Sequence, residues 1–124
     1  MIMGYIKHKS IIVTGWDDDN MKAARQIAVD IFDRNVVDQN GGVSGGSLIG
    51  EIVKGLDGGF ISFFIAPDGS KESFDLSAQC DDARTEFLDW LDANANCDYI
   101  EVFFGGDNSA TSVLRKSKNV FDED

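Results

Sequence analysis

The sequence predicts an α+β fold in which two helices cover one face of a single, mainly antiparallel sheet of four or five strands. Two patterns lead to this expectation. Two segments repeat apolar residues at three- and four-residue spacing, as helices do, and several shorter segments are rich in β-branched and aromatic residues, as strands are. The length of 124 residues and a hydrophobic fraction of 43% suit one core, so we expect one domain over residues 1–124.

The first part of the chain reads as a strand followed by a helix. Tyr5–Thr14 is rich in β-branched residues, and Asp17–Asn20 then supplies side-chain oxygens that can cap a helix N-terminus. The helix is expected to reach Asn35. Its apolar residues share one face: Met21, Ala24, Ile27, Ala28 and Ile31.

Five glycines lie in the eleven residues from Asn40 to Gly50. A phosphate-binding loop leads from a strand into a helix N-terminus, where free backbone N–H groups meet the anion. This loop follows a helix and enters a strand, and it lacks a Gly-Lys-Ser or Gly-Lys-Thr ending. We therefore favour a flexible connection at residues 40–47, with Gly41 or Gly42 ending the helix, over a phosphate site.

A hairpin is predicted in the middle of the chain. Residues 48–55 and Phe60–Ala66 read as strands joined by an Asp-Gly turn. Ser62 is the one polar residue of the second strand, so we expect both its faces to be covered, one by helices and the other by further chain or a second subunit. After a turn at Pro67, residues 71–74 are a candidate edge strand.

The remaining elements complete a recognisable order. A second helix is expected over Asp82–Asn94, residues 99–104 alternate as a strand does, residues 109–117 read as a weak final strand, and the acidic tail at 119–124 is expected to fray. Strand, helix, strand, strand, helix, strand is the split βαβ order of ferredoxin-like folds. That fold class hosts many unrelated functions.

The charge balance favours some partners over others. The chain has 22 acidic and 11 basic residues, a net charge of −11 and a calculated pI near 4.3. Such a field opposes nucleic acids and anionic membranes, so a charged partner is expected to be basic. No apolar run is long enough to span a bilayer and the N-terminus lacks a signal-peptide pattern, so we expect a cytoplasmic protein.

The two cysteines, Cys80 and Cys97, are expected to be free thiols. The predicted helix between them separates its ends by roughly 18 Å, whereas a disulfide needs Cα atoms within about 7 Å. Neither belongs to a CxxC pair, and the single histidine, His8, lies far away in sequence. We expect no metal site, no cofactor and, because no catalytic motif accompanies His8, no enzymatic activity.

The most specific feature is the predicted outer face of the second helix, which carries five carboxylates and no basic residue: Asp81, Asp82, Glu86, Asp89 and Asp92. Spacings of three or four residues correspond to an axial rise of about 4.5 to 6 Å, comparable with the roughly 3.4 Å rise per phosphate of a DNA strand. The face therefore suits docking onto a basic, nucleic-acid-handling protein. The alternative is a solvated helix face.

A second hypothesis is a site for a small anion such as a nucleotide. It would combine Lys7, His8, Lys9 and Arg115, if the final strand pairs beside the first. The aromatic run of the Phe60–Ile65 strand lacks the surrounding basic residues that base stacking needs, so core packing or a homodimer contact is the preferred interpretation.

Three stretches resemble a group of small proteins encoded by bacteriophages and prophages: GYIKHKSIIVT, GGFISFFIAPDGSKES, and EFLDWLDA followed by CDYIEVFFGGD. The resemblance implies an accessory protein made in the bacterial cytoplasm, where small acidic phage proteins are often inhibitors of host machinery. It brings no catalytic signature, so no functional residues are transferred. The resulting hypothesis is a non-enzymatic, nucleic-acid-mimicking inhibitor of a basic host protein, for example one of antiviral defence.

Overall fold

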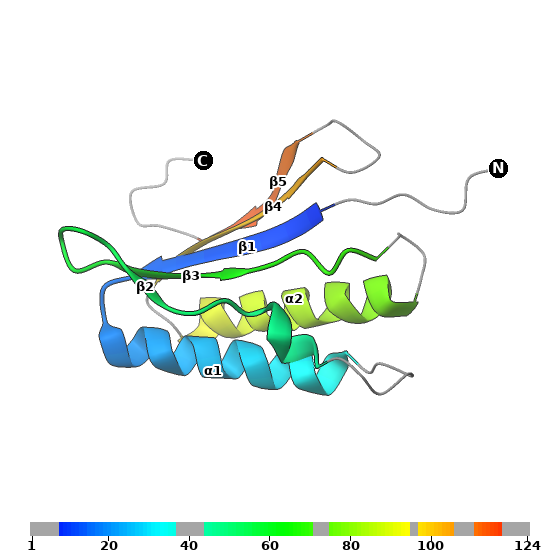
Figure 1. Cartoon of the computed structure of the whole chain (residues 1–124), viewed down its shortest axis with the longest axis horizontal. Helices are drawn as coiled ribbons and strands as arrows, with labels where there is room; N and C mark the ends of the chain where they lie inside the picture. The colour runs from blue at the N-terminus through cyan, green and yellow to red at the C-terminus, as the bar shows by residue number, and fades with distance from the viewer. Residues whose placement is uncertain (1–7, 37–43, 71–74, 95–96, 106–110, 118–124) are drawn as a thin grey trace.

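The protein forms two layers, a sheet and a pair of helices. The computed structural model describes residues 8–36, 44–70, 75–94, 97–105 and 111–117. Its elements, in chain order, are β1 (His8–Gly15), α1 (Asp18–Asn35), the short 3-10 helix η1 (Gly45–Leu48), β2 (Val53–Lys54), β3 (Ile61–Ile65), α2 (Asp75–Asn94), β4 (Asp98–Phe104) and β5 (Ser112–Lys116). Figure 1 shows α1 and α2 on the same side of the sheet.

The sheet has five strands in the order β2-β3-β1-β4-β5, and every neighbouring pair is antiparallel. β1 lies in the middle, where Ile11 pairs with Ile65 of β3 on one side and with Glu101 of β4 on the other. The first four strands have the order of a ferredoxin-like sheet, and β5 is a fifth strand at the β4 edge. The predicted α+β, ferredoxin-like fold class is confirmed.

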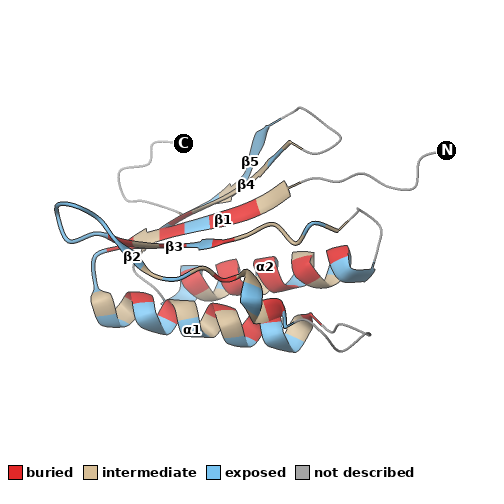
Figure 2. Ribbon diagram, viewed as in Figure 1, coloured by how far each residue is buried: buried red, intermediate tan, exposed pale blue. Residues whose placement is uncertain are grey.

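The core lies between the sheet and the helices. Along β1 the side chains alternate, so Ile11 and Val13 are buried against the helices while Ile12, between them, is 45% exposed. α1 buries the stripe that its three- and four-residue spacing predicts, and Figure 2 shows exposed residues on the side of α1 away from the sheet. In β3, Phe63 contacts Phe87 of α2 with ring centroids 6.3 Å apart.

The predicted start of the first helix and its predicted end at Asn35 are confirmed, but the predicted glycine stop is not. Asp17 is the N-cap, and its side chain accepts a hydrogen bond from the Asn20 N–H at 3.0 Å. The helix ends at Asn35, and the N–H of the extended residue Val36 donates to the Phe32 carbonyl at 3.0 Å. Because the helix has already ended there, neither Gly41 nor Gly42 is its C-terminal stop.

The second helix begins seven residues earlier than predicted, at Asp75 instead of Asp82. Its first two turns bury Ser77 and Cys80, which continue the stripe of larger apolar residues at 87, 88 and 91. The apolar pattern did not reveal these turns, because small residues there contact the core. The acidic residue Asp81 consequently lies inside the helix.

The predicted strand at residues 48–55 is mostly irregular. Ile49 forms an isolated bridge with Ile65, and regular pairing resumes at Val53 opposite Ser62. Three residues separate the two paired positions on this segment and two separate them on β3, so the segment bulges. Arg25 of α1 binds this bulge, since its Nε donates to the Gly50 carbonyl at 2.7 Å.

Part of the predicted flexible loop is built against α1. Residues 40–43 lie outside the described residues, but Gly45 is buried in η1. The Asp33 carboxylate accepts hydrogen bonds from the Ser44 hydroxyl and from the Gly46 N–H, the latter at 2.7 Å. The glycines here therefore allow a close contact between the chain and the end of α1.

The helices cover one face of the sheet. In β3, Ile61 and Phe63 are buried under the helices, whereas Phe64 points to the other side and is 44% exposed. The prediction that both faces of this strand are covered is therefore wrong for the described part of the chain, and a cover supplied by a second subunit stays a prediction. The candidate edge strand at 71–74 and the tail at 119–124 lie outside the described residues.

Candidate functional site: the carboxylates of α2

Of the five predicted carboxylates, Asp81 belongs to a charged cluster between α2 and the sheet. It accepts a hydrogen bond from Lys9 of β1 at 3.0 Å and one from Arg84 at 2.6 Å. Burial disfavours the charged form of Asp81, but the hydrogen bonds from Arg84 and Lys9 outweigh this effect and lower the pKa of its carboxyl. Asp81 is thus a structural partner of two cations.

Arg84 lies at the centre of this cluster, and its role was not predicted from the sequence. It is 1% exposed, and its guanidinium contacts Asp68 at 3.1 Å as well as Asp81. Glu101 of β4 lies 3.6 Å from Arg84 Nε. Burial raises the pKa of the Glu101 carboxyl, although Arg84 and Lys9 counteract it. An arginine among the apolar residues of a helix face was the available sequence signal.

The other four carboxylates, Asp82, Glu86, Asp89 and Asp92, lie on the outer side of α2. We call them the α2 carboxylate row. Two arginines from other elements contact three of them. Arg34 of α1 donates hydrogen bonds to Glu86 from both terminal nitrogens, and Asn35 donates a further one at 3.0 Å. The hydrogen bond from Arg34 is the main cause that lowers the pKa of the Glu86 carboxyl.

Arg115 of β5 joins the other end of the row to the sheet. Its Nη2 lies 2.8 Å from an oxygen of Asp89 and 2.8 Å from an oxygen of Asp92. Tyr99 completes the contact, because its hydroxyl donates to Asp92 at 2.9 Å and accepts from Arg115 Nε at 3.1 Å. α2 itself carries no basic residue on this face, as the sequence predicts, but neighbouring elements bring Arg34 and Arg115 to it.

Charge is nevertheless segregated between the two layers. α2 contains six acidic residues and one basic residue, and α1 contains four acidic and three basic residues. The strands contain two acidic residues and four basic ones. The helix layer is therefore net negative and the strands are net positive. Asp82 and Asp89 are exposed positions on the negative side.

The residues of the predicted anion site are not brought together. Lys9 and Arg115 lie on the helix-facing side of the sheet, where carboxylates of α2 bind them. His8 lies on the opposite side and packs against Phe104 with ring centroids 5.5 Å apart. β4 separates β1 from β5, so the final strand does not pair beside the first. Lys7 lies outside the described residues.

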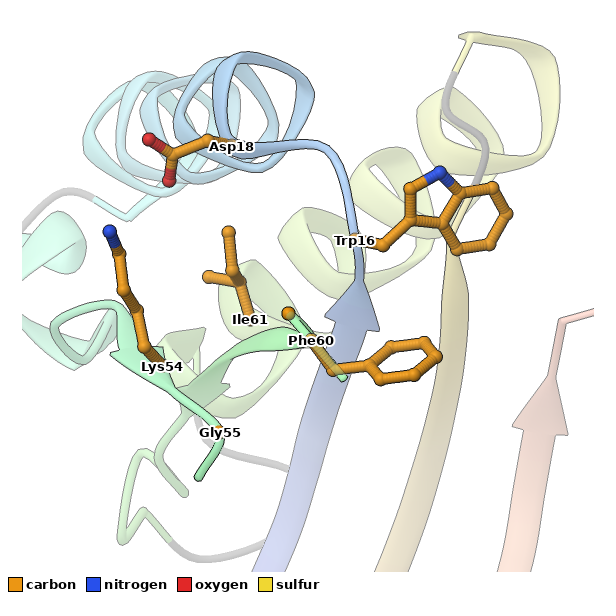
Figure 3. Close-up of a pocket in the computed structure, with 7 residues that line it drawn as sticks. Trp16, Asp18, Lys54, Gly55, Phe60 and Ile61 are labelled. Carbon is orange, nitrogen blue, oxygen red and sulfur yellow. The ribbon is translucent and has the colours of Figure 1, made fainter. Parts of the chain in front are cut away.

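A pocket of about 270 Å³ lies where β1 ends and α1 begins, and it was not predicted. Figure 3 shows the Asp18 carboxylate and the Lys54 ammonium directed to the same space beside Ile61, with the rings of Trp16 and Phe60 near one another. Those two rings meet edge to face at 6.5 Å. Asp18 already binds Lys22 at 3.3 Å. The pocket offers one acceptor and one cation to a small polar group.

Both cysteines are free, and their environment makes them poor nucleophiles. The thiol pKa is raised to about 11 in both Cys80 and Cys97, mainly because the two side chains are removed from water. Since the thiolate is the reactive form, such thiols react slowly near neutral pH. Among the residues that the structure describes, no group of three His, Cys, Asp or Glu side chains is placed to hold a metal ion.

Comparison with protein-family models, with curated proteins and with solved structures found no match to this chain. Neither α1 nor α2 is long and apolar enough to cross a membrane.

Proposed function

We propose that this protein is a non-enzymatic binding protein whose acidic helix α2 docks onto a basic surface of a partner protein. The observation that carries the proposal is the segregation of charge, with six acidic residues and one basic residue on α2 and a net positive set of strands behind it. A face of one sign attracts a partner of the opposite sign and orients its approach.

The arginines that contact the α2 carboxylate row reduce its charge without removing it. Four carboxylates face two arginines, Arg34 and Arg115, so the row stays net negative. Glu86 and Arg34 are both substantially exposed, with 41% and 62% of their side-chain surface accessible. Exposed ion pairs contribute only about 0.2 to 1 kcal/mol, so the basic groups of a partner can compete for these carboxylates.

This arrangement supports recognition of a basic surface more than a close copy of a phosphate backbone. A mimic of DNA needs evenly spaced, uncompensated charges, whereas here Arg115 contacts two neighbouring carboxylates at once. The resemblance to phage-encoded proteins adds a partner class to the proposal, namely a basic host protein that handles nucleic acid. The net charge of −11 opposes direct binding of nucleic acid by this chain.

Opposite charge changes on the same face test the proposal. The Asp82→Asn/Asp89→Asn double variant removes two negative charges from the row, and we expect it to weaken binding of a partner purified from a bacterial lysate about tenfold at moderate salt, roughly 1.4 kcal/mol. Arg34→Gln removes the cation that contacts Glu86, and we expect it to strengthen the same binding. Isothermal titration or biolayer interferometry measures both effects.

Asp19→Asn/Asp30→Asn on α1 is the matched control, because it changes the net charge equally at exposed positions of the other helix. We expect this control to retain most of the affinity. If the control lost as much affinity as the α2 variant, total charge and not the α2 row would govern binding. An unchanged affinity in the α2 variant, or weaker binding by Arg34→Gln, would contradict the proposal.

A further inference from the structure

The face of the sheet opposite the helices is apolar and exposed. We call it the open face. Residues paired directly across antiparallel strands point to the same side, so the register places Phe64 of β3 and Ile100 of β4 on either side of Ile12 of β1. Five large hydrophobic residues on this side are substantially exposed: Ile12 at 45%, Phe64 at 44%, Phe104 at 39%, Val113 at 54% and Val53 at 64%. Ile100 and Val102 on the same side are half-buried, and Ser10, which pairs with Val102, is buried.

The open face continues past the ends of its strands. Alternation places Trp16, two residues after Thr14, and Phe60, two residues before Ser62, on the same side. Trp16 is 59% exposed and Phe60 is 47% exposed, and the two rings contact each other edge to face. The apolar surface is therefore continuous from the centre of the sheet to this end.

The size of the open face suits a protein interface. β1, β3, β4 and β5 are five to eight residues long, and β2 has two residues. With strands about 4.8 Å apart and a rise of roughly 3.3 Å per residue, the sheet has a projected area of roughly 400 Å². The accessible area exceeds the projected area, because side chains stand out from the sheet. A standard interface covers about 800 Å² per partner, and soluble monomers seldom expose a contiguous apolar patch larger than a few hundred Å².

The charge distribution identifies the occupant. The central positions of the open face, such as Ile12, Phe64 and Val102, carry no charge, and Thr14 and Ser62 hydrogen-bond to each other at 2.8 Å. The register also places one charge of each sign on this side, Asp98 opposite Thr14 and Lys116 opposite Ile100. A face with an uncharged centre and charges of both signs gives no preference to a basic or an acidic partner, but its apolar centre is complementary to itself. Two copies that stack through it place their negative helix layers on the outside, where these layers repel each other least.

We propose that two copies of this chain associate through their open faces, with the sheets about 10 Å apart and a two-fold axis passing close to β1. β1 is the middle strand, so Ile12 of one copy lies near Ile12 of the other. The contact involves the whole face and not the Phe60–Ile65 strand alone. The dimer has four layers, helix, sheet, sheet and helix, and presents two acidic helix layers. This proposal does not depend on the proposed function.

The test is the mass of the purified protein in solution, measured by sedimentation velocity and by light scattering over a range of concentrations. One chain has a mass of 13.6 kDa, and we expect the wild type to sediment at twice that value. Ile12→Lys places a charge at the centre of the interface, and we expect it to sediment as one chain and to weaken the dimer at least a hundredfold. Because lysine lowers the net negative charge, added repulsion of the whole chain cannot explain the loss.

Leu56→Lys is the matched control. Leu56 is fully exposed in the turn between β2 and β3, outside the paired strands of the open face, and we expect this variant to stay dimeric. Val113→Lys on β5 is a second variant for the case in which Ile12→Lys does not fold, which far-UV circular dichroism reveals, and it is expected to weaken the dimer less because β5 is at the sheet edge.

Several outcomes would overturn the proposal. A wild-type protein that stays monomeric up to about 100 μM does not have this interface. A dimer with a well-packed interface of standard size would already form at lower concentrations. A dimer that a folded Ile12→Lys variant does not weaken, or, where Ile12→Lys does not fold, a dimer that a folded Val113→Lys variant does not weaken, uses another surface, for example the edge of β5. A monomeric wild type that still binds a partner through the α2 carboxylate row would refute the dimer and leave the proposed function standing.

Discussion

Arg84 has the largest fully buried side chain among the residues that the structure describes. Its guanidinium is buried between α2 and the sheet, where Asp68 and Asp81 accept its hydrogen bonds. Burial lowers the pKa of an arginine side chain, yet the two carboxylates outweigh this effect and raise the pKa of Arg84. Arginine suits such a position because its planar guanidinium donates to several acceptors at once. The charge at this site orients α2 on the sheet.

We expect Arg84→Met to be strongly destabilising. Methionine fills a similar volume, but it leaves Asp68, whose side chain is 8% exposed, without its cation in a buried position. Removing one partner of a buried pair costs about 3 to 5 kcal/mol. Arg34→Met, which breaks the exposed pair with Glu86, is the control and is expected to cost much less, because water screens an exposed ion pair. Chemical denaturation followed by circular dichroism measures both, and equal losses would contradict this interpretation.

Asp81 gives the cluster a predictable dependence on pH. An aspartate whose pKa is lowered in the folded state stabilises that state at pH values above its unfolded pKa of about 3.9, and this contribution is lost as pH falls through the lowered folded value. We therefore expect the free energy of unfolding of Asp81→Asn to fall less steeply below about pH 4 than that of the wild type. Denaturation at a series of pH values measures both slopes, and identical slopes would contradict the assignment.

At the scale of elements, the sequence predicted those helix and strand boundaries that depend on contacts between residues close together in the chain. Asp17 is recognisable as a cap because its side chain reaches only to the Asn20 N–H. The first turns of α2 gave no such signal, since Ser77 and Cys80 fill the core without a large apolar side chain. The reduction of the predicted second strand to Val53–Lys54 could not be foreseen either, because the contact of Arg25 with Gly50 joins segments 25 residues apart.

η1 depends on Gly45 for its approach to α1. A Cβ atom at this position would lie 2.3 Å from the Phe32 carbonyl oxygen and 2.7 Å from Val36 Cβ, distances that force the backbone to move. We expect Gly45→Ala to cost about 1 to 3 kcal/mol of stability.

Gly55→Ala is the control for Gly45→Ala. At position 55 the nearest atom to the added Cβ is the Phe60 carbonyl oxygen, at 3.2 Å, so the contact is less severe. We expect a smaller loss of stability in this variant. Thermal and chemical unfolding of the two variants measure the difference, and an equal or smaller loss for Gly45→Ala would show that η1 can move away from α1.

At the scale of the whole molecule, topology determines which charges meet. The helical wheel placed five carboxylates on the outer side of α2. The structure agrees for Asp82, Glu86, Asp89 and Asp92, because their spacing is a local property, but it turns Asp81 toward Lys9 of the sheet. The arginines that contact them come from positions 52 and 26 residues away, Arg34 on α1 and Arg115 on β5. Sequence spacing carries no information on such pairs. The position of the α2 carboxylate row could therefore be predicted from the sequence, but its contacts with Arg34 and Arg115 could not.

The central position of β1 in the sheet determines how long this strand waits for a partner during synthesis. Its edges pair with β3 and with β4, so that His8 finds its partner Phe104 almost a hundred positions further along the chain. At the usual rate of translation, roughly 5 to 20 seconds pass between the synthesis of these two residues. Throughout that interval the apolar run Ile11, Ile12 and Val13 lacks its β4 neighbour, so one edge of the strand that becomes the middle of the sheet stays unpaired until the last third of the chain has been made.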